Sequence, residues 1–395
     1  MIGNFIILSI VFLFILVKKY ELIPFMFILF LPMSNIFGET ANILGVLGYH
    51  EILSIGVIFH YFMLRDKKLP SNKFTNQISN LLFAYLLVAF YVYFKEMFFE
   101  FSAFDYSAIF KRLVKAILEY TAIVIIIRSI NRNNYKLFLW AVLIGTLFLA
   151  FAGSYSYFSD SLLITRSADG RITGIITGNP NEFAAILAIS MGFLLYLIEN
   201  KRSKLKTIYI IGFVISFIAV LLTGSRTGFF SVIIILFIYF YRNFTLRNSL
   251  FIFLFIIILI GIFYVNGGLV LERLFSLEEY VGSNIKEEAR VQKWGIYLKH
   301  IIDNPRFLIY GSESNAYHRA AHNIFISSIH DAGIIISLFL LTVYWKFIKT
   351  SVKEMEFAYV FLPFLFASIM GSSALYYYYY VFAFPIIGFI KSNKL

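Results

Sequence analysis

Apolar runs separated by short polar breaks cover almost the whole chain. Each run is about 15 to 25 residues long, the length that a helix needs to cross a lipid bilayer. The runs give thirteen candidate spans at residues 2–17, 21–37, 41–64, 78–99, 106–127, 135–157, 180–198, 207–223, 227–241, 249–266, 321–345, 357–371 and 374–390. The pattern predicts an all-α fold, a polytopic transmembrane helical bundle of 12–13 spans that forms a single transmembrane domain over residues 1–395. The first span decides between the two counts and sets the side of the N-terminus.

One long polar segment, residues 267–320, interrupts this pattern, and we expect it to form a large, partly helical loop outside the membrane. Within it, residues 286–304 carry apolar side chains at spacings of three and four, as on one face of a helix. Asn304 and Pro305 then end the pattern. The spacing predicts a helix that lies on the membrane surface.

Composition agrees with the membrane class, since 60% of the residues are hydrophobic, 14% are charged and the mean hydropathy is +0.81. The net charge of +12 is attributed to topology signals and to attraction for anionic lipid or phosphate, and not to nucleic acid. The chain has no cysteine, which excludes disulfides and thiolate chemistry.

Lysines and arginines gather in alternate connections between the spans. Twenty of them fall on one side, and the other short connections hold only Arg226. Basic residues mark the cytoplasmic side, so the 267–320 loop and the 158–178 connection are predicted to face outward. No ATP or nucleotide sugar is available there. A substrate must therefore arrive already activated.

The connection Thr223-Gly224-Ser225-Arg226-Thr227-Gly228 reads as a tight polar turn at the outer surface. An arginine at this depth is costly unless it is paired or hydrated, and its planar fork suits a phosphate. A simple end-anchor that reaches toward the headgroups is the alternative for Arg226. The glycines and hydroxyls, including Ser225, favour an anion site because they allow close approach to the backbone.

A helix start is predicted at Gly178-Asn179-Pro180-Asn181-Glu182. Asn179 can cap the helix, Pro180 fits its first turn, and Glu182 can complete a capping box. This explains the motif without any function. A helix N-terminus at the outer surface is also an anion site, so Asn179 and Asn181 are candidate supporting residues.

Two further candidates belong to the long loop and its end. Arg290 precedes Trp294 by one turn, and a solvated pair with Glu287 is its alternative role. His322 stands in Ala321-His322-Asn323, where the last predicted loop residues meet the eleventh span. A helix N-terminus lowers the pKa of a histidine, which favours a neutral imidazole suited to a general base. Asn323 is a supporting candidate.

The remaining histidines are assigned no chemistry. His330 and Asp331 lack a third ligand at metal-binding spacing, so we predict no bound metal and no cofactor. His300 and His318 are expected to be exposed loop residues. His50 and His60 are expected in the core or lumen of the third span.

Basic residues also occur inside the fifth span, where Lys111, Arg112, Lys115 and Glu119 occupy its outer half. Such residues should face a cavity. They either line the approach of an anionic lipid or form an internal ion pair between Lys115 and Glu119.

Taken in order, the motifs Gly-Asn-Pro-Asn at 178–181, Thr-Gly-Ser-Arg-Thr-Gly at 223–228, Arg290 with Trp294, and Ala-His-Asn at 321–323 followed by Gly333 are similar to those of the O-antigen ligase and O-antigen polymerase superfamily. The resemblance covers residues 178–340. It implies a bacterial inner-membrane glycosyltransferase that takes a glycan from undecaprenyl pyrophosphate without metal or nucleotide sugar. It assigns Arg226 and Arg290 to the pyrophosphate and His322 to the acceptor.

The residue chemistry agrees, because such a transfer needs a base for the acceptor hydroxyl and a cationic clamp for the leaving group. A single displacement with inversion is expected if no carboxylate acts as a nucleophile, and Glu182 and Asp331 are the two carboxylates that could contradict this. The ligase pattern has a small or polar residue at the position where this chain has Ile336. We therefore prefer the polymerase to the ligase, which transfers the glycan to the lipid A core. Partners are then the lipid-linked glycan, membrane lipid and, for a polymerase, a chain-length regulator protein.

Two other classes stay open. A lipid-linked oligosaccharide flippase or other secondary transporter would show internal repeats, broken helices and ionisable groups near the bilayer midplane. A membrane protein whose outer loop only binds a partner would not need arginines in three outer connections. The Lys111–Glu119 cluster is the feature that would favour a transporter.

Overall fold

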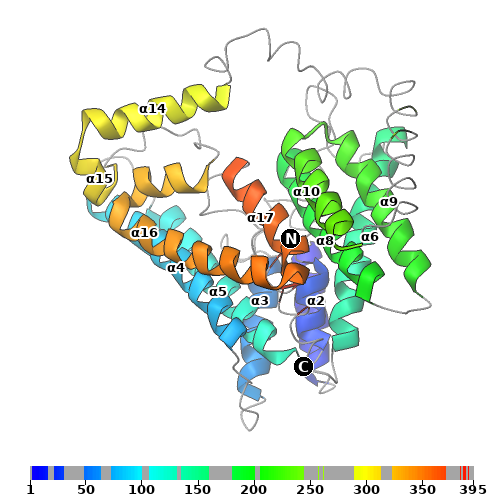
Figure 1. Cartoon of the computed structure of the whole chain (residues 1–395). Coiled ribbons are helices and arrows are strands. Elements are labelled where there is room, and N and C mark those ends of the chain that lie inside the picture. Colours follow the sequence, from blue (N-terminus) through cyan, green and yellow to red (C-terminus); the bar gives the residue numbers. More distant parts are fainter. Residues whose placement is uncertain are drawn as a thin grey trace. The chain divides into compact units, whose positions relative to one another are not determined.

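The computed structural model describes residues 2–16, 22–30, 49–63, 73–99, 106–130, 135–159, 180–200, 205–243, 289–312 and 323–370, with isolated positions at 257, 261, 383, 386, 387 and 390. These residues are helical and contain no strand. The helices are α1 Ile2–Leu16, α2 Leu22–Phe30, α3 Tyr49–Met63, α4 Lys73–Phe99, α5 Tyr106–Ser129, α6 Tyr135–Ser159, α8 Pro180–Asn200, α9 Lys206–Leu222, α10 Arg226–Arg242, α14 Ala289–Asp303, α15 Arg306–Tyr310, α16 Ile324–Lys353 and α17 Met355–Met370 (Figure 1). The predicted all-helical class is confirmed for this part of the chain.

Helix boundaries follow the predicted breaks closely. α8 begins at Pro180, α10 begins within the predicted turn, and α14 ends at Asp303 directly before Asn304 and Pro305. The predicted spans at 249–266 and 374–390 fall almost entirely outside the described residues. The count of 12–13 spans and the single transmembrane domain therefore stay predictions.

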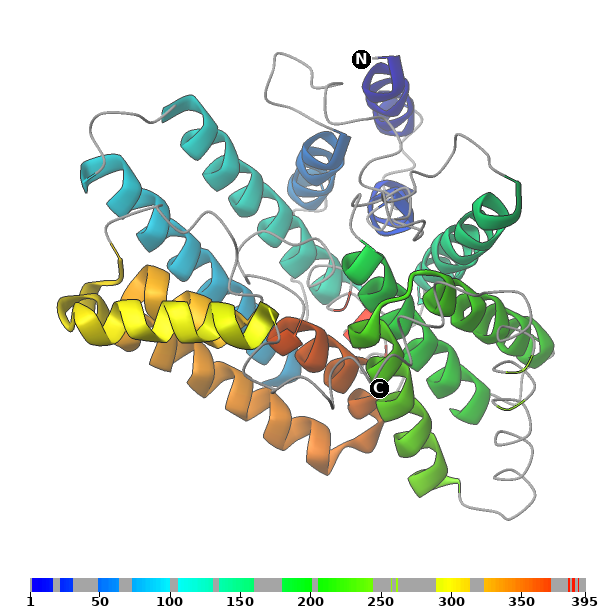
Figure 2. The ribbon, with the colours of Figure 1, turned by 90° about the horizontal axis from the view of Figure 1, so that it is seen from above.

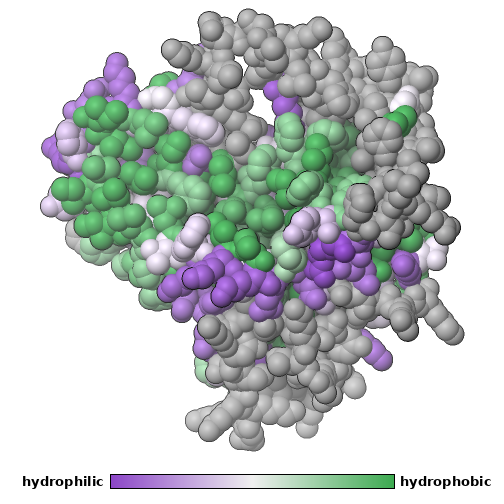
Figure 3. Space-filling model, in the orientation of Figure 1, coloured by the Kyte–Doolittle hydropathy of each residue, from purple (hydrophilic) through white to green (hydrophobic). Residues whose placement is uncertain are grey.

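Three described helices are long and apolar enough to cross a membrane: Lys136–Tyr155, Pro180–Glu199 and Ile324–Lys353. They suggest a membrane protein. Figure 3 shows a broad hydrophobic area on the surface. α16 exposes large apolar side chains, among them Ile335, Leu338 and Trp345, which suits lipid contact better than contact with water.

The described residues form two compact units. The first comes from residues 1–145, 293–350 and 372–395, and the second from residues 146–292 and 351–371. In the second unit α8 is the central helix and packs against α9, α10 and α17 (Figures 1 and 2). α10 approaches α8 so closely that a Cβ atom at Gly228 would collide with Ala184.

Polar contacts at both ends fix the directions of α8 and α10. At one end Ser225 donates a hydrogen bond to Asn181, and at the other end Arg242 pairs with Glu199 at 2.8 Å. The two helices are therefore parallel, with both N-termini at the same end. Tyr359 near the start of α17 also donates to Glu199 at 2.8 Å. Phe366 near the end of α17 lies against Phe230 of α10 with ring centroids 6.4 Å apart. α17 is therefore antiparallel to both helices. These directions agree with the predicted alternation of the chain.

In the first unit α3 packs against α1, α2 and α5, and α5 packs against α4. Three side-chain contacts connect α4 to α16: Gln77 with Thr350, Tyr85 with Tyr344, and Lys95 with the carbonyl of Asp331. Residue numbers rise in α4 as they fall in α16. The two helices are therefore antiparallel over most of their length.

α16 differs from the predicted uninterrupted eleventh span, because it is broken at Gly333, where φ is 77° and ψ is 170°. The ring centroids of Phe325 and Tyr344 lie 5.7 Å apart, whereas a straight helix would separate these residues by about 28 Å at 1.5 Å per residue. The segment before Gly333 thus folds back along the segment after it. The second segment, 334–353, is still about 30 Å long, and Phe325 near the start of the first segment lies beside Tyr344 near the middle of the second.

Candidate functional site

The predicted turn at residues 223–228 caps the N-terminus of α10. Gly224 has a φ of 57°, and Ser225 is the N-cap residue, whose side chain accepts a hydrogen bond from the backbone N–H of Gly228 at 3.3 Å. Thr223 accepts from the N–H of Ser225 at 3.1 Å. Arg226 is the first residue of the helix and is partly exposed. The hydroxyls of Thr223 and Ser225 therefore stabilise the start of α10, where Arg226 is the first residue.

The same hydroxyl of Ser225 donates to the side-chain oxygen of Asn181 at 2.9 Å. This bond brings the start of α8 beside the start of α10. Helix N-termini carry partial positive charge and backbone N–H donors that favour anions. We call Asn181, Ser225 and Arg226 the helix-start cluster. Its amide and guanidinium donors, together with two aligned helix starts, provide the chemistry of an anion site.

Several predicted site residues lie outside the described residues or are described only in part. Asn179 and His322 lie outside them. Lys111 and Arg112 belong to α5, and Arg290 belongs to α14, but their side chains are not among the described ones. The assignments of these five residues stay predictions.

Asn323 has a clear local role. Its side-chain oxygen accepts from the N–H groups of Phe325 at 2.9 Å and Ile326 at 3.2 Å, which is the geometry of an N-cap. It therefore starts α16 and fixes the helix end that follows His322 in the sequence. The position of this helix start at the outer surface stays a prediction.

Lys115 forms an ion pair with Glu51 of α3 at 3.1 Å, a partner that the sequence reasoning did not propose. Glu119, its predicted partner one turn further along α5, is buried. His50 and His60 of α3 are buried as predicted. Ionisable groups of α3 and α5 thus meet inside the first unit.

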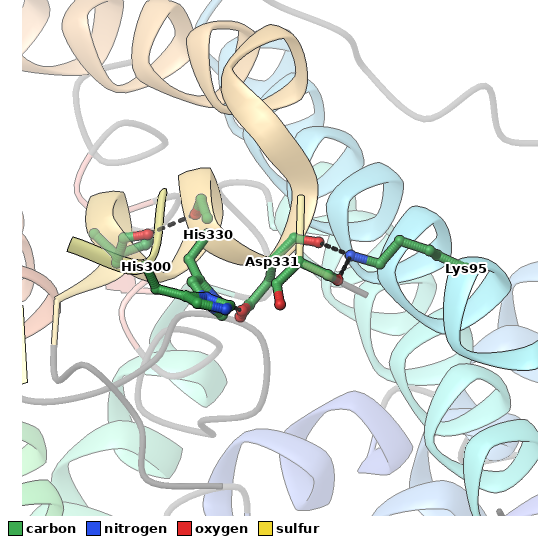
Figure 4. Close-up of polar contacts among 7 residues, drawn as sticks. Lys95, His300, His330 and Asp331 are labelled. Atoms are coloured by element: carbon green, nitrogen blue, oxygen red, sulfur yellow. Dashed lines mark hydrogen bonds and ion pairs between the residues drawn. The ribbon is translucent and has the colours of Figure 1, made fainter. Parts of the chain in front are cut away.

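A second polar cluster joins α14 to α16 in the first unit (Figure 4). The ring nitrogens His300 Nδ1 and His330 Nε2 lie 3.1 Å apart, and His330 Nδ1 lies 2.7 Å from Asp331 Oδ1. The ring of Tyr297 packs against that of His330 with centroids 4.6 Å apart. His300, predicted to be an exposed loop residue, lies on the predicted loop helix, is only partly exposed and contacts His330. We call His300, His330 and Asp331 the imidazole chain.

The side chain of Lys95 on α4 binds the backbone next to the imidazole chain. Its ammonium group donates to the carbonyls of Ser312 and Asp331, the latter at 2.6 Å, and its side chain is buried. The Ser312 N–H in turn donates to the His330 carbonyl at 2.6 Å. The loop after α15 is therefore fastened to the break in α16.

Burial and the neighbouring His330 ring lower the pKa of His300 below its ordinary value of 6.5, against the opposing effect of Asp303. The His300 imidazole is therefore neutral at pH 7 and can accept a proton. Within the described part of the chain, no group of three or more His, Cys, Asp or Glu residues could hold a metal ion.

No family model matches the chain, and neither a curated protein nor a solved structure gives a significant match. The resemblance to the O-antigen ligase and polymerase superfamily therefore remains a prediction from the sequence motifs.

Proposed function

We propose that this protein is a bacterial inner-membrane glycosyltransferase that polymerises undecaprenyl-pyrophosphate-linked repeat units into a surface polysaccharide at the periplasmic face. In this proposal Arg226 and Arg290 bind the pyrophosphate and His322 removes the proton of the acceptor hydroxyl. The reaction needs neither a metal nor a nucleotide sugar.

The helix-start cluster is the observation that supports this proposal. Asn181 and Ser225 come from motifs 44 residues apart that the sequence assigned to the same outer face. Their hydrogen bond aligns two helix N-termini, with Arg226 at the first position of α10. A diphosphate is a multiply charged anion, and such a cluster of backbone and guanidinium donors suits it.

The expected chemistry is a direct displacement. The acceptor oxygen forms a bond to the anomeric carbon of the donor sugar, the bond from that carbon to the phosphate oxygen breaks, and the lipid pyrophosphate leaves with the electron pair. Negative charge develops on the leaving group, so cationic donors that are already in position lower the barrier. An imidazole that accepts the hydroxyl proton lowers it further.

Replacement of His322 by Ala should abolish chain extension, while the protein still inserts and lipid-linked single repeats accumulate. Arg226→Lys and Arg290→Lys should each already impair extension, because a point charge cannot reproduce bidentate phosphate contact. Arg306→Lys on α15 is the matched control and should extend chains normally. Normal long-chain product from the His322 variant, or full activity of both lysine variants, would overturn the assignment.

Gel analysis of surface polysaccharide from a deletion strain separates the polymerase from the ligase. A single repeat attached to the lipid A core is the product expected when polymerase is lost. Bare core would instead assign the ligase reaction to this chain.

A transporter of lipid-linked oligosaccharide is the second candidate, and two observations favour it. α16 is interrupted at Gly333, and Lys115 and Glu51 pair inside the first unit, while transporters use broken helices and intramembrane ionisable groups. Lys115→Met and Glu51→Gln should then stop export, whereas His322→Ala should not. The reverse result supports the glycosyltransferase.

A further inference from the structure

α14 carries two apolar rows that lie side by side, and only one of them is covered by protein. Tyr297 and Ile301, one turn apart, are 5% and 7% exposed. Leu298 and Ile302 each stand one position further along the sequence and form the neighbouring row, because residues four apart lie on the same face of a helix. They are 47% and 73% exposed. We call Leu298 and Ile302 the exposed apolar row.

Contacts of the buried row fix how α14 is rotated against α16. The ring of Tyr297 packs against that of His330 with centroids 4.6 Å apart, and His300 Nδ1 lies 3.1 Å from His330 Nε2. These contacts hold α14 by one side. The exposed apolar row therefore cannot turn toward the protein unless they break.

A third row, next to the exposed apolar row, is charged. It is formed by Lys299 and Asp303, again one position further along the sequence, and both are exposed. The surface of α14 thus changes from protein contact, through apolar side chains, to charged ones. The same order is expected where a helix lies beside a span at a membrane surface, with hydrocarbon under its apolar side and headgroups along its charged side.

α15 extends the apolar surface toward a candidate membrane span. Leu308 and Ile309 of α15 are exposed, and the Ile309 carbonyl lies so close to Gly333 that a Cβ atom there would collide with it. Just past this break, Ile335 and Leu338 of α16 are exposed as well. The apolar side of α15 therefore adjoins a helix that is long and apolar enough to cross a membrane (Figures 1 and 3).

The second segment of α16 indicates the depth of α15. This segment, 334–353, is about 30 Å long, which equals the thickness of the hydrocarbon layer. Its basic end, with Lys349, marks one boundary of the layer, so Gly333 and the adjoining α15 lie at the other. Lys95 and Asp331 meet beside the break, which agrees with this depth because charged groups are costly inside the layer.

The charges of α14 and α15 favour anionic lipid. Residues 293–310 carry three basic side chains, Lys293, Lys299 and Arg306, and one acidic side chain, Asp303. Lys299 and Arg306 are exposed. Basic residues close to a membrane surface attract anionic headgroups, and basic residues beside an apolar face are typical of helices that lie in the interface.

We propose that α14 and α15 form an interfacial anchor on the predicted outer side of the membrane. The exposed apolar row and the apolar side of α15 enter the edge of the hydrocarbon layer, and Lys299 and Arg306 bind the headgroup phosphates of anionic phospholipid such as phosphatidylglycerol. This inference goes beyond the proposed function, because the anchor serves a transferase and a transporter alike.

Spin labels measure the depth of the anchor in the full chain, whose lack of cysteine allows one label at a time. The protein is reconstituted in vesicles of phosphatidylcholine and phosphatidylglycerol. Labels at Leu298→Cys and Ile302→Cys should collide mainly with oxygen, which concentrates in hydrocarbon, and little with a water-soluble nickel chelate. Ile296→Cys is the matched control. It is 49% exposed, like Leu298, but lies on the opposite side of α14, so its label should meet mainly nickel.

Two results of this experiment would overturn the anchor. The first is the same ratio of oxygen to nickel collisions at all three positions, because the helix would then have no side that faces the membrane. The second is protection of the labels at Leu298→Cys and Ile302→Cys from both reagents. That result would assign the exposed apolar row to a protein partner or to a second copy of the chain.

Brominated lipids test the preference for anionic headgroups. A fluorophore at Ile302→Cys should be quenched more strongly by brominated phosphatidylglycerol than by brominated phosphatidylcholine at the same mole fraction. Each basic residue at the surface should enrich the anionic lipid about 5-fold, so Lys299→Gln should lower the enrichment by about that factor. Added salt should lower it as well.

Lys346→Gln is the matched control for this second experiment, because Lys346 is also exposed but belongs to the basic end of α16. It should leave the enrichment unchanged. Equal quenching by the two lipids, or an enrichment that Lys299→Gln does not lower, would overturn the proposal.

Discussion

Two glycines determine the backbone at the break in α16. Gly311 and Gly333 both have a φ of 77°, a conformation that side chains rarely adopt. A Cβ atom at Gly333 would collide with the Ile309 carbonyl, and one at Gly311 with the Asp331 carbonyl. The loop after α15 and the bend in α16 can cross only because both positions lack a side chain.

Gly333→Ala should therefore destabilise the protein by about 1–3 kcal/mol from the backbone conformation alone. Thermal unfolding of the purified protein in detergent measures this. Gly295→Ala on α14 is the control, because nothing lies within 4 Å of its added methyl group and alanine is the better helix former. Equal stability of the two variants would contradict the close backbone contact between the loop after α15 and the bend at Gly333.

His300 gives the protein a predictable response to acid. Folding lowers the pKa of His300. Below about pH 6.5 this side chain therefore binds a proton in the unfolded chain at pH values where it stays neutral in the folded chain. Stability is thus full above the unfolded pKa and falls as the pH drops toward the folded one. The unfolding temperature should decline less between pH 7.5 and 5.5 in His300→Asn than in the unmodified protein. If the unfolding temperature falls equally with pH in the two proteins, folding does not lower the pKa of His300.

Single residues were predictable from the sequence where their partners are local. The start of α8 at Pro180 follows from short-range rules, and Asn181, Ser225 and Arg226 were named as candidates from two local motifs. Glu51 as the partner of Lys115, and His300 as the partner of His330, come from other helices. No spacing rule reports such contacts. The tight bend at Gly333 was also missed, because an apolar run around one glycine looks like an unbroken span.

At the scale of helices, α8 and α10 are held at both ends. The far end is a partly buried pair, Arg242 with Glu199, to which Tyr359 of α17 also donates. The side chains of Arg242 and Glu199 are 21% and 13% exposed. Removal of one charge leaves the other partly buried without its ionic partner, which is the costly way to break such a pair.

Arg242→Met should cost about 3 kcal/mol, the lower end of the range for buried pairs because both side chains keep some exposure. The double variant with Glu199→Gln should lose less than the sum of the two single losses. The difference, about 0.5–3 kcal/mol, is the coupling energy of the pair. Purely additive losses in thermal unfolding would mean that the contact does not hold the two helices together.

Helix positions were the most predictable part of the fold. Start and stop signals such as Pro180 and Asn304-Pro305 act within one turn, and they agree with the described ends of α8 and α14. The direction of α8 relative to α10 also followed from the alternation of basic connections. What could not be predicted was the path of α16, which depends on contacts with α4 and the loop after α15.

For the whole molecule, the orientation in the membrane is open to a direct experiment because the chain has no cysteine. A single cysteine introduced at Tyr310, exposed on α15, should react with a membrane-impermeant maleimide in intact spheroplasts. One introduced at Lys349, near the basic end of α16, should react only after the membrane is opened. The opposite pattern would reverse the predicted orientation.

Lys95 also has a consequence for how the protein is made. Its two carbonyl partners follow it by 217 and 236 residues, so α4 leaves the ribosome long before they exist. During that interval the ammonium group of Lys95 lacks these two acceptors, and a charged group inside an apolar helix is costly in lipid. We therefore expect the insertion machinery to keep α4 out of contact with lipid, or near the membrane interface, until Ser312 and Asp331 have been synthesised and can accept these hydrogen bonds.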